Sequence, residues 1–229
     1  MKKSLFFSML AALMVLALSS CSLNEDLLKN MVGTYTDNDP DEKVTLQFYP
    51  STDGETGRFI ECRESLKDGK DSDGIELNIH MTVFVTGTYK VTADQRLSYV
   101  YDLDEVAVFY DEDDMAAYVQ RNIEYNDAHD NAWGYQGHEA AEIQEQLEAN
   151  MKEVDLESWK EFYESENKDF KTLSYPDVKC DGKTFSFSAS EGEKVTYTRV
   201  AEDMFKPDFF DEEEVEEMAD AAEKAGEAE

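Results

Sequence analysis

Residues 75–85 read IELNIHMTVFV, and this stretch decides the fold class. Its odd-numbered positions are all apolar, and its even-numbered positions are polar except for Phe84. Because successive side chains of a strand point to opposite faces, the pattern predicts a strand with one buried and one wet face. Such two-sided strands are typical of antiparallel sheets and barrel walls.

The same alternation recurs on both sides of this stretch. Further strands are predicted near residues 44–49, 97–101, 106–110, 173–175, 185–187 and 195–199. The glycine-containing segment DGKDSDG at 68–74 reads as a hairpin loop. The sequence therefore predicts a mainly β fold, either an antiparallel lipocalin-like barrel or a sandwich.

Residues 111–171 break the alternation and favour helices. Met115, Val119 and Ile123 share a helical stripe, and the acidic residues before them suit a helix N-terminus. Asp155 is a residue type that caps helices and is expected to start a further helix. The expected fold is α+β overall, with a helical insertion at 111–171.

The first twenty residues have the parts of a secretory signal peptide. Lys2 and Lys3 are positive, residues 5–18 are mainly apolar, and small residues precede Cys21. The apolar stretch is shorter than the roughly 20 residues that a membrane-spanning helix needs. We therefore expect residues 1–20 to be removed.

The sequence LSSC at 18–21 resembles the lipobox of bacterial lipoproteins. That resemblance implies that the sulfur of Cys21 is diacylated and that this residue becomes the N-terminus. An ordinary secretory signal with an incidental cysteine is the alternative. Residues 21–30 are expected to form a lipidated tether and a short lead helix. The acidic SLNED at 22–26 resembles the tether of Bacteroidetes lipoproteins, so the chain is expected at the outer membrane, surface-exposed or facing the periplasm.

The chain is strongly acidic. Its 53 acidic and 21 basic residues give a net charge of −32, which becomes −34 once Lys2 and Lys3 leave with the signal. This charge repels nucleic acid and anionic lipid headgroups, and it favours cationic partners. Residues 202–229 hold 13 acidic and 2 basic residues, so residues 201–229 are read as a solvated acidic tail.

Lipidation of Cys21 would leave Cys62 and Cys180 as the other cysteines. Secretion permits a disulfide between them, and an even number is consistent with one. Two buried thiols fit equally well. No Cys/His spacing indicates zinc.

Two segments share a motif, VGTY at 32–35 and TGTY at 86–89. The first, together with an arginine on the last predicted strand, resembles the calycin pattern of lipocalins and of lipocalin-like lipoproteins of Bacteroidetes. The resemblance implies that Gly33 and Tyr35 close the barrel bottom and that Arg199 packs across it. It implies a lipocalin-like β domain over residues 31–200. An arginine on an apolar face needs a partner, and an aromatic ring would be one.

No motif of a familiar enzyme class occurs in the chain. The patterns GxSxG, HExxH, GxGxxG and the P-loop are all missing from the sequence. Paired carboxylates are too common among 53 acids to single out a glycosidase pair. We expect no enzyme and no cofactor, with a hydrolase as a distant alternative.

Metal binding has only weak candidates. One cluster contains Asp127, His129, Asp130, His138 and Glu139, in or beside a polar loop where such residues are usually solvated. The acidic stretches at 37–42 and 67–74 do not match an EF-hand loop and read better as turns. No metal site is expected.

The loop Trp133-Gly134-Tyr135 is the best candidate contact site, because flat amphipathic rings lose little entropy on binding. Packing of Trp133 back over the helices is the alternative. The expected function is non-catalytic binding of a small apolar or amphipathic ligand inside the barrel, lined by Ile75, Leu77, Ile79 and Met81. The other expectation is an acidic interaction module that docks a cationic protein partner.

Overall fold

The computed structural model describes residues 25–37, 39, 42–51, 54–170, 174–189 and 193–205. The expected signal peptide, the expected lipidation site Cys21 and residues 206–229 of the expected tail lie outside the described residues.

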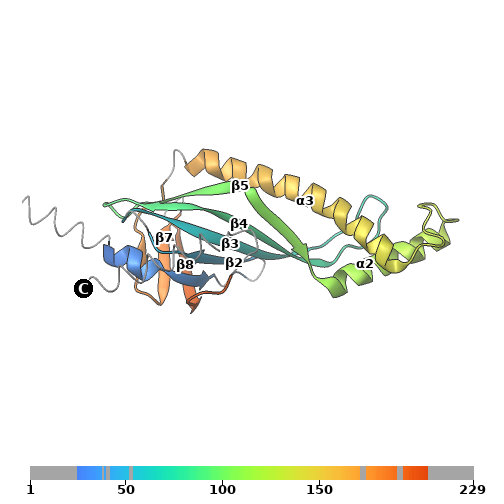
Figure 1. The fold of residues 1–229 in the computed structure, drawn as a ribbon, viewed down its shortest axis with the longest axis horizontal. Coiled ribbons are helices and arrows are strands. Elements are labelled where there is room, and N and C mark those ends of the chain that lie inside the picture. Colours follow the sequence, from blue (N-terminus) through green and yellow to red (C-terminus); the bar gives the residue numbers. More distant parts are fainter. Residues whose placement is uncertain are drawn as a thin grey trace, which may run out of the picture.

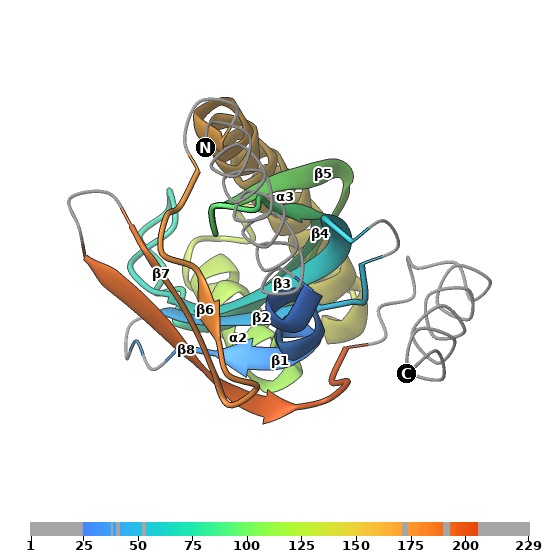
Figure 2. The same cartoon turned by 90° about the vertical axis from the view of Figure 1, so that its left-hand side faces the viewer.

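Eight strands form one antiparallel sheet that curls around a packed interior (Figures 1 and 2). The order across the sheet is β5-β4-β3-β2-β1-β8-β7-β6. This confirms the prediction of an antiparallel, β-rich α+β fold. The strands are β1 (Gly33–Thr36), β2 (Glu42–Phe48), β3 (Thr56–Lys67), β4 (Ile79–Val91), β5 (Leu97–Tyr110), β6 (Lys179–Cys180), β7 (Thr184–Ser188) and β8 (Lys194–Ala201).

The sheet is not closed into a barrel, so the expectation of a closed barrel is wrong. A single antiparallel bridge joins Leu97 of β5 to Tyr175, with both backbone N–O distances at 2.8 Å. The edge strand β6 has two residues, and no ladder joins it to β5 in the described part of the chain. The strands also belong to one sheet, so the alternative of two separate sandwich sheets is not formed either.

The alternation at 75–85 correctly predicts the strand β4, but it places the start of that strand too early. β4 begins at Ile79, and its inward residues Met81 and Val83 are buried as predicted. Ile75 and Leu77 precede the strand and pack against helices instead of the sheet. β5 is a single strand, although the sequence predicted two strands at 97–101 and 106–110.

Three helices complete the described fold. Residues 25–31 form a short helix, which matches the predicted lead. Helix α2 (Glu112–Ala128) and helix α3 (Ala140–Phe170) form the predicted insertion. Asp155 lies inside α3, so the prediction that it starts a separate helix is wrong. The described helices are too short or too polar to cross a membrane.

The buried residues form two clusters. The first, here called the interior cluster, lies inside the curled sheet and includes Tyr35, Phe48, Phe59 and Tyr163. The second, here called the helix–hairpin cluster, joins the β3–β4 hairpin to the helices and is built on Ile75, Ile79, Met115 and Tyr118. Helix α3 contributes to both and runs along β5 from one to the other (Figure 1).

The chain after β8 turns back over the sheet. Gln47 of β2 accepts the amide N–H groups of Met204 and Phe205 at 2.7 and 2.8 Å. The ring of Phe205 packs edge-on against Phe84, with 5.3 Å between centroids. The start of the expected tail is therefore part of the packed domain.

Candidate functional site

The structure brings together the three residues assigned by resemblance. Tyr35 pairs with Arg199 between β1 and β8, and the Arg199 guanidinium lies 6.0 Å from the Tyr35 ring centroid. Gly33 has φ +133, and a Cβ there would lie 2.9 Å from the Arg199 side chain. Glycine is needed on both counts. Arg199 has the aromatic partner that its position requires, while a role for the trio in closing the interior stays a prediction.

The two cysteines do not form a disulfide. Cys62 and Cys180 are both free thiols. The Cys180 sulfur lies 3.3 Å from the Tyr35 hydroxyl oxygen, beside the interior cluster. Cys62 follows Glu61, which points inward, and so faces the opposite side of the sheet. Burial raises the pKa of the Cys62 thiol to about 12.

Aromatic rings fill the inside of the sheet, where the sequence placed a ligand cavity. Phe48 is 1% exposed, and five other rings lie within 5.0 to 6.4 Å of it, centroid to centroid: Tyr35, Phe59, Tyr89, Tyr99 and Phe185. Close packing of this kind is a core, not a binding site.

A buried polar network fastens α3 to this core. Glu61 is 3% exposed and accepts hydrogen bonds from the hydroxyls of Tyr101 and Tyr163 at 2.9 and 3.1 Å. Arg63 Nε donates to the same carboxylate at 2.5 Å. Burial alone would lower the pKa of Arg63, but the charge and hydrogen bond of Glu61, together with Tyr163 and Tyr101, raise that pKa. The buried carboxylate is thus compensated by charge and by hydrogen bonds.

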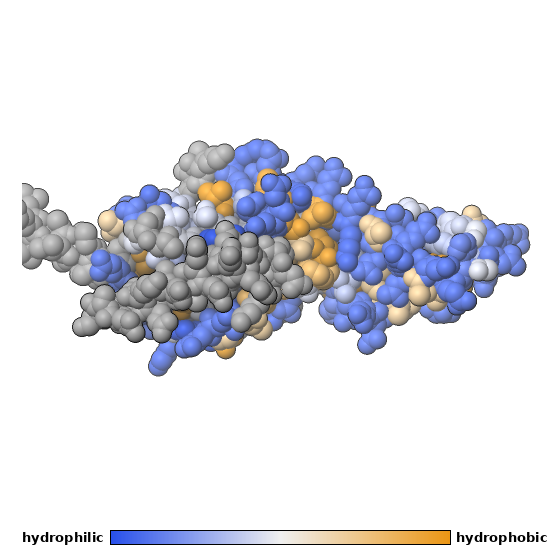
Figure 3. All heavy atoms as spheres, in the orientation of Figure 1, coloured by the Kyte–Doolittle hydropathy of each residue, from blue (hydrophilic) through white to orange (hydrophobic). Residues whose placement is uncertain are grey.

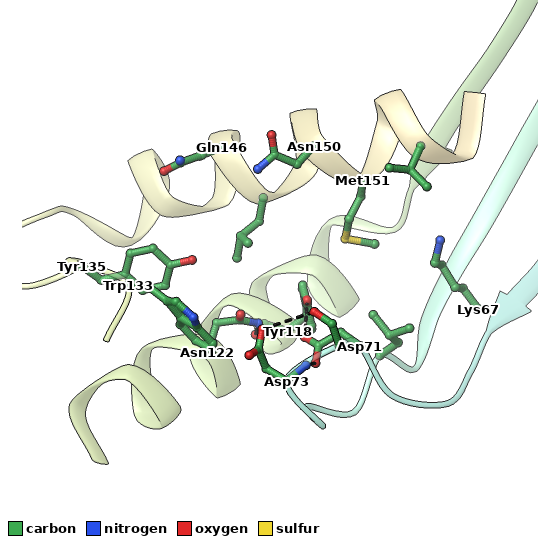
Figure 4. Close-up of a pocket in the computed structure, with 14 residues that line it drawn as sticks. Lys67, Asp71, Asp73, Tyr118, Asn122, Trp133, Tyr135, Gln146, Asn150 and Met151 are labelled. Carbon is green, nitrogen blue, oxygen red and sulfur yellow. Dashed lines mark hydrogen bonds between the residues drawn. The ribbon is translucent and has the colours of Figure 1, made fainter. Parts of the chain in front are cut away.

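A groove of about 780 Å³ lies away from the sheet interior, between the β3–β4 hairpin, α2 and α3 (Figure 4). Its walls combine aromatic, aliphatic, amide and carboxylate groups. The lining residues are Lys67, Asp71, Ser72, Asp73, Leu77, Tyr118, Asn122, Trp133, Tyr135, Gln146, Leu147, Asn150, Met151 and Val154. Figure 3 shows that the surface of this helical end is mostly hydrophilic, with scattered apolar residues.

The hairpin wall of the groove is held by Asp71. Its Oδ1 accepts the amide N–H groups of Asp73 and Ile75 at 3.0 and 2.9 Å, which fixes the turn. Its Oδ2 accepts the hydroxyl of Tyr118 on α2 at 2.8 Å. The hairpin and the helix are therefore joined by a partly buried side-chain hydrogen bond.

The loop wall is held by Asn126, which is fully buried at the end of α2. Its Oδ1 accepts the amide N–H of Trp133 at 2.9 Å, and its Nδ2 donates to Asn131 Oδ1 at 3.0 Å. The Trp133 ring stacks on Tyr125, with centroids 4.7 Å apart and planes 15° apart. Trp133 thus packs back on α2, as the alternative predicted, and also lines the groove.

The third wall is α3, which is anchored beside the groove by an ion pair. Lys67 Nζ lies 2.5 Å from Asp155 Oδ2, and Asp155 Oδ1 also contacts it. The Tyr110 hydroxyl donates to the same carboxylate at 2.7 Å. Asp155 is 8% exposed, so its charge is compensated inside the fold.

The two histidines of the weak metal cluster have separate partners. The His129 ring stacks on Tyr125 with centroids 3.9 Å apart, and His138 Nδ1 lies 3.1 Å from Glu142 Oε2. Within the part of the chain that the structure describes, no three His, Cys, Asp or Glu side chains are grouped to hold a metal ion.

Sequence reasoning singled out Trp133 and Tyr135 and missed the residues that hold the groove. Asp71 and Asn126 act through local backbone hydrogen bonds, which any Asp or Asn in a polar loop could make. Asp155 has its partner 88 residues away in the chain, so no local pattern reveals it.

Comparisons of the chain with protein-family models, with curated proteins and with solved structures found no match.

Proposed function

We propose that the chain is a lipid-anchored envelope lipoprotein whose lipocalin-like domain binds a small amphipathic ligand without chemically changing it. The observation that carries the proposal is the groove between the β3–β4 hairpin, α2 and α3. Its volume falls within the roughly 300–1,000 Å³ range of small-molecule sites. The site is this groove and not the inside of the sheet.

The groove suits an amphipathic molecule because its walls offer two kinds of surface. Leu77, Leu147 and Met151 supply an apolar wall that would cover an alkyl or ring system. Asn122, Gln146 and Asn150 supply amides that would hydrogen-bond to polar groups. The partly buried ring of Trp133 is already ordered by Tyr125, so little entropy is lost on binding.

The anchor is proposed from the sequence. The signal-like residues 1–20 and the LSSC motif support diacylation of Cys21 and attachment to the outer membrane, facing the cell surface or the periplasm. Mass spectrometry of the chain extracted from bacterial membranes should find residue 21 as a diacylated N-terminus. An unmodified N-terminus at any other residue would rule the anchor out.

Ligand binding is tested with short amphiphiles and the fluorescence of Trp133. The complete mature chain would carry Cys21→Ser, so that no acyl group competes, and Trp159→Phe, so that Trp133 is the single tryptophan. Octyl glucoside, octanoate and octyltrimethylammonium would each be titrated below their micelle concentrations. We expect a saturable change with at least one of them.

A matched pair of variants assigns the response to the groove. Leu147→Ser should weaken binding about tenfold, because a leucine contact is worth roughly 1.5–3 kcal/mol. Leu66→Ser makes the same change at a 44% exposed leucine outside the groove and should leave binding unchanged. The absence of a saturable response to all three amphiphiles would sink the proposal.

An acidic interaction module is the second candidate. A second hollow of about 520 Å³ between α3 and β5 is lined by five acidic residues, one lysine and two leucines. The acidic residues are Asp104, Glu153, Glu157, Glu161 and Glu164. A cationic protein surface would be attracted there, and its binding would weaken steeply with salt.

A further inference from the structure

The positive charge that lines the groove has a partner of opposite sign, whereas the negative charges have none among the described residues. Lys67 is the single basic residue among the described residues of the lining. Its ammonium group is bound to both oxygens of Asp155, which also accepts the Tyr110 hydroxyl. The positive charge of the lining is therefore already neutralised within the fold.

The two carboxylates of the lining, Asp71 and Asp73, form no ion pair with a cation in the described part of the chain. Asp71 accepts hydrogen bonds from two backbone amides and from the Tyr118 hydroxyl, which are all neutral donors. Asp73 is exposed, and the hydroxyl of Ser72 lies 3.4 Å from its Oδ2. Two negative charges thus face the groove from one short turn.

Aromatic rings lie close to these carboxylates. The Tyr118 hydroxyl donates to Asp71, and Figure 4 shows Asp73 on the same hairpin turn as Asp71. Burial, together with the charge of Asp73, raises the pKa of the Tyr135 hydroxyl. Trp133 and Tyr135 rings lie 5.6 Å apart. Carboxylates and aromatic rings that line the same groove are a combination that attracts organic cations.

We infer that the ligand of the groove carries a cationic amine or quaternary ammonium group, held by Asp71 and Asp73 beside the Trp133 ring, with its apolar body along Leu147 and Met151. This inference rests on the proposed function, because it names the ligand class of the same groove. Asp71 and Asp73 on the hairpin would favour a positively charged group, and Leu147 and Met151 on α3 would favour an apolar body.

The opposite ligand charge is disfavoured by the site and by the whole chain. An anionic amphiphile would meet two uncompensated carboxylates and a net charge of −34 on the mature chain. A neutral amphiphile would keep the contacts to the amides and to the apolar wall, but it would gain nothing from Asp71 and Asp73.

The test compares the three eight-carbon amphiphiles on the single-tryptophan chain, at concentrations that leave its circular dichroism spectrum unchanged. We expect octyltrimethylammonium to bind about tenfold more tightly than octyl glucoside, and octanoate to bind most weakly. Asp73→Asn should weaken the cationic amphiphile about fivefold and leave octyl glucoside unchanged.

Asp68→Asn is the matched control, because it removes the same charge from the same hairpin outside the groove lining. It should change the affinity for octyltrimethylammonium less than twofold. Equal losses from Asp68→Asn and Asp73→Asn would mean that the overall negative charge attracts the cation, and the inference would be overturned. Equal affinities for the cationic and neutral amphiphiles would overturn it too and leave the proposed function standing. Only the failure of all three amphiphiles to saturate the groove would remove both.

Discussion

The inside of the sheet and the groove contain similar residue types, but the first is filled by side chains and the second is open. Both contain tyrosines, a carboxylate joined to a basic residue, and aliphatic side chains of α3 or the strands. In the interior, Glu61 accepts hydrogen bonds from two tyrosine hydroxyls, and the ring of Phe48 packs against neighbouring rings. In the groove, Asp71 and Asn126 bind backbone groups of their own loops, and the rings stack only on one side. Rings that have neighbours all round stabilise the fold, and rings that a loop holds on one side stay accessible to a ligand.

The largest expected difference comes from truncating one ring in each region. Phe48→Ala removes a ring that is 1% exposed and should lower the free energy of unfolding by about 3–5 kcal/mol. Tyr135→Ala removes a ring at the groove margin and should lower it by less than about 1 kcal/mol. Urea unfolding followed by circular dichroism gives both values. Similar losses for the two variants would break the comparison.

A smaller difference is expected from two ion pairs on neighbouring strands. Arg63→Met leaves the Glu61 carboxylate buried without its charged partner, which should cost about 3 kcal/mol of unfolding free energy. Lys43→Met removes the partner of Glu64 from a pair in which both side chains are 45% exposed, and it should cost less than about 1 kcal/mol. Urea unfolding at pH 7 compares the two. A cost for Arg63→Met as small as that for Lys43→Met would show that water reaches Glu61.

The smallest effect per residue concerns alkaline pH. Burial raises the pKa values of Tyr99, Tyr101 and Tyr163 well above the usual 10. Above pH 10 the unfolded chain loses these phenol protons while the folded chain keeps them, so stability is lost as pH rises. Each tyrosine should contribute about 1.4 kcal/mol per pH unit. Unfolding midpoints between pH 9 and 11 measure the slope, and Tyr101→Phe should reduce it. A flat profile would contradict the burial of these hydroxyls.

Much of the fold could be predicted from local patterns. Alternation located β2, β4, β7 and β8, because each has one face on the interior cluster. It placed the start of β4 too early, because Ile75 and Leu77 are buried by the helices and so look like strand residues. The prediction of a barrel also went too far, since alternation indicates that a strand has one buried face and does not determine whether the two edge strands of the sheet pair.

The site could be predicted only in part. The Trp133 loop was recognised because Trp and Tyr beside glycine are conspicuous in a polar segment. The groove itself depends on which segments meet, and its walls come from the hairpin, α2 and α3. Gly33, Tyr35 and Arg199 could be placed together because a family resemblance, and not a local pattern, linked positions far apart in the chain.

Helix α3 connects the interior of the sheet to the groove. Its 31 residues span about 46 Å as one uninterrupted rod, with Tyr163 immobilised against the sheet and Leu147 in the groove. The helix is held at its sheet end by the hydrogen bond of Tyr163 to Glu61, and nearer its middle by the ion pair of Asp155 with Lys67. The width of the opening between α3 and the hairpin is therefore set through Tyr163 and Asp155, two residues of α3 that do not line the groove.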